Sequence, residues 1–460
     1  MRRMLVSLIL VISCVPAFAQ ERAEDRRRFL APSTRVSADP RRVPSKGLRG
    51  PDGTIVIHGG RVFDGTGAPA RPGTVLIEGN LLQPILPPEV TSWPEDARVI
   101  DATGKTVMPG LIDLHTHLSY SEPNLDPLIG NDLSDATLRG VERLRFYIES
   151  GITSVRDVAS HRQVPFRLKA WVAENRIPGP RVFAAGQLIT GTGGHGAEGL
   201  APGSALYGDV REAKGPDDWR EAVRQQFKAG ADVIKIASHF SREEVKAAIE
   251  EAHTLGLRVT CDCETFYVEW AVEAGVDCIE HPLPRTDAAI VMMAKRGVYA
   301  VPTLIPYVYI FDQSGGYFDS SSRRFTFSKE ANVSMLVRMK RAGVRMGVGT
   351  DLVESWFRFL PQPYIAELRH FESAGYGTAG ALLAATRTNA EILDMADRLG
   401  TLEVGKLADV LIVDGQPDVD LDDLAKVDTV IRDGYVVVEK GKILVPRHEP
   451  VPAPTPTVRR

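Results

Sequence analysis

The chain has 460 residues, of which 43% are hydrophobic and 25% are charged. This is the composition of a globular protein that is long enough to bury a large core and to form more than one domain. The formal net charge is -4, and so small a charge gives no electrostatic reason to expect binding to nucleic acid or to an anionic membrane.

The first residues have the pattern of an export signal. Two arginines after Met1 precede a short apolar run at 4–15, and a small-x-small sequence, Ala17-Phe18-Ala19, follows. This order predicts a secretory signal peptide over residues 1–19. The apolar run is too short to span a bilayer, so we expect no transmembrane segment in the mature chain. Lipid attachment at Cys14 is the less favoured alternative. We therefore expect an exported protein, either periplasmic or extracellular.

Composition then divides the chain into a middle part and two similar ends. Residues 20–53 are rich in Arg, Pro and Ser and are predicted to be a solvated linker, with a basic docking arm as the alternative. Short β-rich segments with turn signals follow at 54–109 and return at 396–447. We therefore predict one small β-sandwich domain formed from both chain ends. A Pro-rich tail at 448–460 follows it.

The middle part, residues 110–395, alternates short apolar strands with helical patterns, among them a predicted helix around 133–149 and a predicted strand at 345–351. About eight strand–helix units can be counted, which is the number that closes a (β/α)₈ barrel. The fold class that we predict is therefore α/β, with a TIM-like (β/α)₈ barrel beside the small β-sandwich. A doubly wound sheet is the alternative. The barrel is favoured because the candidate functional residues stand at the C-terminal ends of strands, where barrel active sites lie.

The first strand of this part ends in the pair His115 and His117. Side chains alternate along a strand, so both imidazoles leave it on the same side. They can form half of a metal site, although a lone His-x-His also fits a surface or core pair.

Later strands end in further polar residues. Lys235 lies inside an apolar run, where its charge is costly unless it is paired or removed. It can be half of a buried ion pair, or it can be carbamylated by CO₂ and so carry a carboxylate. His281 can be a core histidine or a ligand, and Asp351 can be a ligand or a helix N-cap.

Taken in order, these motifs resemble the metal-dependent amidohydrolase superfamily, and in particular its imidazolonepropionase-like, prolidase-like branch. The resemblance covers nearly all of residues 54–445 and as an ordered set is highly specific. The residues that carry it are 109–117, 151–157, the Gly-rich 193–196, Lys235, Glu280-His281, 349–351 and 400–409.

The resemblance implies one or two divalent ions per chain, commonly Zn²⁺. His115, His117 and Asp351 would hold the first ion, and His281 would help to hold the second. A CO₂-derived carbamate on Lys235 would bridge them. A metal-bound hydroxide would then attack the substrate, with Asp351 as the catalytic proton carrier.

The resemblance also raises two pocket residues as candidates. His195, in the Gly-rich loop, is expected to contact the substrate or the developing oxyanion. Tyr120 would line the substrate pocket or would be a packing aromatic. The implied partner is a small-molecule substrate, and the oligomeric state, including a homo-oligomer, is left open.

One position departs from the family pattern. Relatives have a histidine at the end of the fifth strand, where this chain has Asp262. A carboxylate can bind zinc, but it is a harder ligand than imidazole. Asp262 can therefore be a substitute ligand, or the second ion can be weak or absent, and we favour these two readings together. Loss of activity is the third reading.

The remaining cysteines lie in one region. With Cys14 in the signal peptide, Cys261, Cys263 and Cys278 remain, and this odd number is not a disulfide framework. We expect Cys261 and Cys263 to face the helices as packing residues and not to bridge each other. Their facing the interior as soft ligands is the minor alternative.

The main hypothesis is an exported, metal-dependent amidohydrolase that cleaves a C–N amide bond in a dipeptide, an N-acyl amino acid or a cyclic amide. The alternatives are a catalytically silent binding protein that keeps the barrel, and a lactone or ester hydrolase that uses the same site.

Overall fold

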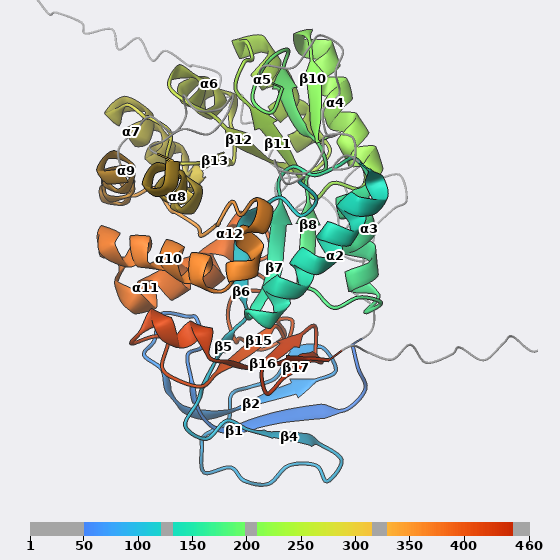
Figure 1. Cartoon of the computed structure of the whole chain (residues 1–460). Coiled ribbons are helices and arrows are strands. Elements are labelled where there is room, and N and C mark those ends of the chain that lie inside the picture. Colours follow the sequence, from blue (N-terminus) through green and yellow to red (C-terminus); the bar gives the residue numbers. More distant parts are fainter. Residues whose placement is uncertain (1–49, 121–131, 198–208, 315–328, 445–460) are drawn as a thin grey trace, which may run out of the picture.

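The computed structural model describes residues 50–120, 132–197, 209–314 and 329–444 (Figure 1). The expected signal peptide, the expected linker up to residue 49 and the Pro-rich tail lie outside these ranges. No helix of the described ranges combines the length and the apolar character that a membrane crossing requires.

Strands from both chain ends form one nine-stranded sheet (Figure 1). Its centre is the antiparallel pair β5–β15, in which Pro109 is opposite Val410 and Thr106 is opposite Val413. One face packs on a core of branched aliphatic side chains that includes Ile57, Val75, Val107, Val410 and Ile412. The strands are β1 (Thr54–Val62), β2 (Arg71–Glu78), β3 (Leu81–Leu82), β4 (Arg98–Asp101), β5 (Thr106–Pro109), β15 (Val410–Val413), β16 (Val427–Arg432), β17 (Tyr435–Glu439) and β18 (Lys442–Ile443).

Between these ends the chain alternates parallel strands and helices, so the α/β prediction is confirmed. One sheet has the order β6-β7-β8, and another has the order β10-β9-β11-β12-β13-β14. These strands are β6 (Leu111–Thr116), β7 (Ile152–Asp157), β8 (Arg181–Ala184), β9 (Leu188–Gly191), β10 (Val210–Ala213), β11 (Val233–Ala237), β12 (Arg258–Asp262), β13 (Cys278–Glu280) and β14 (Tyr299–Val301).

The helices follow the strands and cover their outer faces (Figure 1). Local sequence explains where several of them start and stop. Helix α5 begins at a capping box in which Ser241 and Glu244 bond each other's backbone N–H groups. Three helices end at a left-handed glycine, Gly230, Gly275 or Gly297. The helices of this part are α2 (Leu133–Glu149), α3 (Val164–Ala173), α4 (Gly215–Ala229), α5 (Arg242–Thr254), α6 (Phe266–Ala274), α7 (Asp287–Arg296), α8 (Leu304–Ser314), α9 (Lys329–Ala342), α10 (Gln362–Phe371), α11 (Gly377–Leu383) and α12 (Asn389–Ile392).

The expected strand at 345–351 is not a continuous strand. It forms isolated parallel bridges at Met346 and, just beyond, at Leu352. Backbone hydrogen bonds nevertheless tie the segment to β14 on one side (Ala300 N to Arg345 O, 3.1 Å) and to β6 on the other (Leu114 N to Val348 O, 3.0 Å). Glycine at 349 is what allows this close approach, because a Cβ there would lie 2.9 Å from the backbone nitrogen of His115.

A further hydrogen bond links the two parallel sheets where β8 ends and β11 begins, since Asp232 N donates to Ala184 O at 2.8 Å. The strands and the 345–351 segment thus run in parallel, with their C-terminal ends on one side. The division into a barrel domain and a sandwich domain stays a prediction.

Candidate metal centre

Three side chains from two neighbouring segments converge where β6 ends. His115 and His117 come from the end of β6, and Asp351 comes from the end of the 345–351 segment. Asp351 Oδ1 lies 3.1 Å from His117 Nε2 and 3.5 Å from His115 Nε2. One ligand atom from each residue falls within 4.8 Å of the others, which is the spacing of a metal-binding group.

The other ring nitrogens fix the tautomers of the two histidines. His115 Nδ1 donates to Glu280 Oε2 at 2.8 Å, and His117 Nδ1 donates to the carbonyl of Ala159 at 2.9 Å. With Nδ1 as the hydrogen-bond donor of each ring, Nε2 is the nitrogen that can present a lone pair to a metal ion. These lone pairs face a carboxylate oxygen, an arrangement of acceptors that needs a cation between them. Metal-binding histidines are held by their second nitrogen in this way.

The protonation state of His115 agrees with a metal-binding role. Burial, followed by the charge of Lys235, lowers the pKa of His115, so its ring is neutral. Its Nε2 is buried and has no hydrogen-bond partner among the described residues. The Asp351 carboxyl group lies beside both rings and offers oxygen ligands to a cation.

A buried acid joins the two segments that carry these ligands. Asp113 Oδ1 accepts hydrogen bonds from the backbone N–H groups of His115 and Thr350, both at 3.0 Å, and Oδ2 accepts from Thr350 Oγ1 at 2.5 Å. Burial raises the pKa of Asp113 to about 7. Asp351 itself adopts a left-handed backbone with φ 50°, and its N–H donates to the carbonyl of His115 at 2.8 Å. These bonds set the spacing of the ligands.

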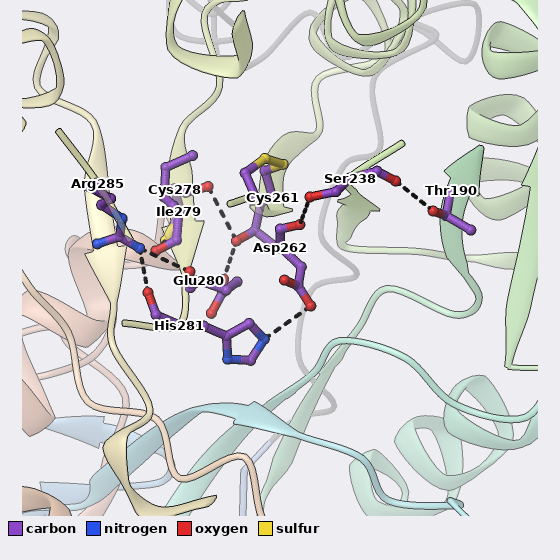
Figure 2. The surroundings of a disulfide bond; sticks show 11 residues. Thr190, Ser238, Cys261, Asp262, Cys278, Ile279, Glu280, His281 and Arg285 are labelled. Carbon is purple, nitrogen blue, oxygen red and sulfur yellow. Dashed lines mark hydrogen bonds and ion pairs between the residues drawn. A yellow bond between two sulfur atoms is a disulfide. The ribbon is translucent and has the colours of Figure 1, made fainter. Parts of the chain in front are cut away.

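A second group meets the first at Asp351. Asp262 Oδ2 lies 3.2 Å from His281 Nε2 and 3.3 Å from His195 Nε2. His281 Nδ1 lies 2.7 Å from Thr303 Oγ1, and it also lies 3.7 Å from Asp351 Oδ2. The Asp262 carboxylate therefore faces the ring of His281 (Figure 2).

Lys235 lies in the middle of β11, paired in register with Thr260 of β12. Its side chain is only 2% exposed. The amine makes no hydrogen bond or ion pair with another residue of the described ranges. Burial lowers the pKa of Lys235, although the charges of Glu280 and Asp262 oppose that effect. A buried amine with a lowered pKa is more easily neutral than an ordinary lysine.

The two pocket candidates lie at the rim. The ring of Tyr120 stacks on His117, with 4.0 Å between centroids and 6° between planes. The side chain of His195, in the loop after β9, is 26% exposed. The structure thus brings the candidates from six segments to one place, and their roles stay predictions.

Sequence reasoning missed the residues that hold the ligands. Glu280, which is fully buried, accepts from His115 through one oxygen and from Arg156 through the other, at 2.5 Å. Thr260 Oγ1 donates to the same Glu280 oxygen, and Arg285 holds the backbone carbonyls of Glu280 and His281. The available signal was a charged residue in each of two apolar strands, Arg156 in β7 and Glu280 in β13.

One expectation about the cysteines is wrong. Cys261 and Cys263 form a disulfide (Figure 2). In a regular strand, residues two apart have Cα atoms about 6.6 Å apart, but here the distance is 5.3 Å, within the range for a disulfide. The chain is less extended because β12 ends at Asp262. Both sulfurs still lie in the hydrophobic core, away from the Asp262 carboxylate, as expected of packing residues.

Comparisons with known proteins give similar enzymes. The sequence profile of the amidohydrolase family matches residues 106–437. The ochratoxinase of Aspergillus niger is 22% identical over 400 residues, which are 79% of this chain and 81% of that enzyme. The imidazolonepropionase of Geobacillus sp. (strain WCH70) is 25% identical over 379 residues, 76% of this chain and 84% of that enzyme. A solved prolidase structure, in complex with N-methylphosphonate-L-proline, has a TM-score of 0.76 and 30% identity, over 84% of this chain and 100% of that chain.

Proposed function

The chain belongs to the amidohydrolase family and is a hydrolase, as its ordered motifs predicted, and we propose that it cleaves the C–N amide bond of a small molecule in a metal-dependent reaction. Among the substrates considered, a dipeptide is favoured, because the similar prolidase is 30% identical over its full length. The observation that carries the proposal is the pair of imidazole lone pairs of His115 and His117 facing the Asp351 carboxylate.

The fold that we propose is the (β/α)₈ barrel with a small β-sandwich. Strands β6 to β8 and β11 to β14 would close through the 345–351 segment, which is hydrogen-bonded to β14 and to β6. The bond from Asp232 N to Ala184 O supports closure between β8 and β11. In such a barrel the C-terminal strand ends form the active-site face, and the candidate ligands stand there. Residues 110–395 would be the barrel, and 54–109 with 396–447 the sandwich.

The donor set fits a divalent ion such as Zn²⁺. Two neutral imidazoles and a carboxylate are ordinary zinc donors, and here they would be His115, His117 and Asp351. His281 and Asp262 would hold a second, weaker ion, because carboxylate replaces imidazole at 262. A bound ion would supply positive charge that acidifies a nearby water and polarises the scissile carbonyl.

We propose in addition that Lys235 is carbamylated. Its ammonium would first lose one proton. The neutral amine would then attack the carbon of CO₂, so that an N–C bond forms, one C=O bond of CO₂ opens to a carboxylate oxygen and a second proton leaves the nitrogen; a cationic side chain thus becomes an anionic one. This change would remove a buried ammonium that has no partner, and it would provide the bridging carboxylate. Incubation with ¹³C-bicarbonate should give a carbamate carbon signal by NMR that the Lys235→Met variant lacks. A signal of equal intensity in that variant would contradict the assignment.

The protein groups would move one proton through the reaction. Asp351, as a carboxylate, would take it from the attacking water as the O–C bond forms. The C–N bond then breaks, and Asp351 would return the proton to the leaving nitrogen. His195 would donate a hydrogen bond to the carbonyl oxygen as negative charge develops there. Tyr120, stacked on His117, would wall the pocket.

The test is an assay of the purified mature chain. Bound metal is measured, and a dipeptide panel is assayed with and without chelator. We expect hydrolysis that chelator abolishes and divalent ion restores, and a loss of roughly 10²- to 10⁴-fold in Asp351→Asn. Asp217→Asn, an exposed carboxylate on α4, is the matched control and should keep full activity. Turnover that is insensitive to chelator would defeat the proposal.

A second candidate is a catalytically silent binding protein, which Asp262 alone favours. The Asp262→His variant separates the two. If the native chain has no activity and this variant gains it, the silent reading is correct. A lactone or ester hydrolase using the same carbonyl chemistry is tested by adding lactones and esters to the panel.

We also propose that the chain is exported, on the basis of residues 1–19. Cell fractionation with a tagged full-length chain tests it, and N-terminal sequencing of the secreted form should begin at Gln20. Recovery of uncleaved chain in the cytoplasm would contradict export.

A further inference from the structure

The structure contains a second cavity at the opposite end of the strands from the metal centre. Its volume is about 510 Å³. It is lined by residues at the N-terminal starts of parallel strands, namely Arg181 of β8, Val233 of β11, Arg258 of β12, Cys278 of β13 and Tyr299 of β14. The candidate metal ligands stand at the C-terminal ends, so the two sites lie on opposite sides.

The buried pair of Arg156 and Glu280 separates this cavity from the metal centre. Arg156 and Thr260 line the cavity, and both donate to the Glu280 carboxylate, whose other oxygen holds His115. The cavity therefore does not open directly onto the candidate active site, and the proposed reaction gives it no role.

The walls of the cavity are largely apolar. Aliphatic, aromatic and thioether side chains come from helix α3, from the strand starts and from the segment after α12. These are Val172, Val182, Phe183, Leu257, Val259, Tyr299, Ile392, Leu393, Met395 and Leu407. A ligand of suitable size would bury an apolar body of several carbon atoms against them.

Most charges at the cavity are paired. Each of the acids that line it has a basic partner, and Arg181 contacts two acids at once. The pairs are Lys169 with Asp232 (2.5 Å), Arg258 with Asp394 (2.9 Å), His253 with Asp277 (2.8 Å), Arg176 with Glu174 (3.5 Å), and Arg181 with Asp409 (3.2 Å) and Asp433 (3.6 Å).

Two other arginines of the cavity lining make no direct ion pair with an acid of the described ranges. Arg432 is 2% exposed, donates only to the neutral oxygens of Val172 and Asn175, and has an Nε with no hydrogen-bond partner. Burial and the adjacent Arg181 lower the pKa of Arg432 to about 10, although the charges of Asp409 and Asp433 oppose that effect. Arg398, half-buried in the same lining, makes no ion pair with an acid of the described ranges. A buried guanidinium without an anion is unfavourable, and guanidinium groups bind carboxylates and phosphates well.

We propose that this cavity is a second binding site, for a small organic anion with an apolar body, held by Arg432 and Arg398. A carboxylate and a phosphate monoester share the required chemistry. The anionic group would complete the charge balance, and the apolar part would occupy the walls. This inference is independent of the metal chemistry proposed above.

The binding test uses the full mature chain and isothermal titration calorimetry. The probes are 4-bromophenylacetate, phenyl phosphate, the neutral 2-(4-bromophenyl)ethanol and inorganic phosphate. We expect an organic anion to bind, and the neutral and inorganic probes to bind at least tenfold more weakly. Tighter binding of one organic anion then identifies the carboxylate or the phosphate as the natural group. Absence of binding by both organic anions at millimolar concentration would overturn the proposal.

Variants locate the site. Arg398→Gln should weaken binding by about tenfold or more, the effect of one charge-assisted hydrogen bond. Arg341→Gln, an exposed arginine on α9 outside the cavity, is the matched control and should bind normally. Asp351→Asn should also bind normally, which excludes the candidate active site as the place of binding. Unchanged affinity in Arg398→Gln would overturn the proposal.

A crystal structure with 4-bromophenylacetate gives an answer even if a variant fails to fold. Anomalous scattering from bromine should appear among Val182, Leu257 and Met395, with the carboxylate near Arg432 and Arg398. Bromine at the metal centre, or only at surface positions, would contradict the inference.

Discussion

Replacement of Glu280 is the most informative single substitution. Its carboxylate contacts both the buried charge of Arg156 and the candidate metal ligand His115. It is fully buried, and it contacts Arg156 at 2.5 Å and His115 Nδ1 at 2.8 Å. Replacement by glutamine removes the charge with little change of volume. Two effects should follow, one on the apo protein and one on metal binding.

The effect on the apo protein comes from Arg156. Its guanidinium is 2% exposed, and without Glu280 it keeps only the carbonyl of Leu114 as a strong acceptor, at 2.6 Å. Removing one member of a buried ion pair typically lowers the free energy of unfolding by about 3–5 kcal/mol. We expect Glu280→Gln to fall in this range, measured by urea unfolding in the presence of chelator.

The effect on metal binding comes from His115. A carboxylate that accepts from a ligating histidine raises its basicity and fixes its tautomer, and its loss typically weakens metal binding roughly 10- to 100-fold. We expect this in Glu280→Gln by zinc titration against a competing chelator. The control is Thr260→Val, which removes a different bond to Glu280 and should cost only about 1 kcal/mol of stability with little change in zinc affinity.

A double variant separates the two effects. Glu280→Gln with Arg156→Met removes both charges, so stability should recover in part while zinc affinity does not. The reasoning would be refuted if Glu280→Gln bound zinc as tightly as the native chain, since His115 would then not depend on this carboxylate.

Three further outcomes follow from the structure. Burial opposes ionisation of Asp277, but the hydrogen bond from His253 outweighs it and holds the pKa of Asp277 below its usual value. The contribution of ionised Asp277 to the free energy of unfolding should therefore be complete above pH about 4 and be lost as pH falls further. Asp277→Asn should lower the free energy of unfolding by about 1–3 kcal/mol at pH 7, and the difference from the native chain should shrink below pH about 4; a constant difference in acid unfolding curves would contradict this. Burial raises the pKa of the free thiol Cys278 to about 12, so iodoacetamide at pH 8 should alkylate it only after unfolding, as mass spectrometry can show; rapid labelling of the native protein would count against it. Gly349→Ala should lower the free energy of unfolding by about 1–3 kcal/mol, because the new Cβ would lie 2.8 Å from His115 Cβ. Gly380→Ala is the control and should be tolerated, because its new Cβ would make ordinary contacts at 3.4 Å. Equal melting temperatures for the two variants would refute the packing argument.

Local pattern was sufficient for the regular elements. The helix expected at 133–149 is α2 with the same bounds, and the alternation of apolar strands with helices reproduces most of the middle part. Helices α3 and α7 were not among the predicted elements. The residues that reach the C-terminal ends of strands could also be found, since direction along a parallel strand follows from chain order.

Contacts between strands could not be read in the same way. The disulfide of Cys261 and Cys263 depends on where β12 stops being extended, and the weak strand at 345–351 depends on how closely Gly349 packs on His115. Neither property is visible in periodicity, because periodicity reports only which side of an element is buried.

By itself, then, the sequence determined the alternating α/β architecture, the family, and the set of histidines and acids that could form a site. Only the tertiary structure decided how they are held. It showed that Glu280 and Arg156 support His115, and that Arg432 and Arg398 make no direct ion pair with an acid of the described ranges. The reason is physical: chemical type and periodicity are local properties of a chain, whereas the partner of a buried charge is chosen by packing between distant segments.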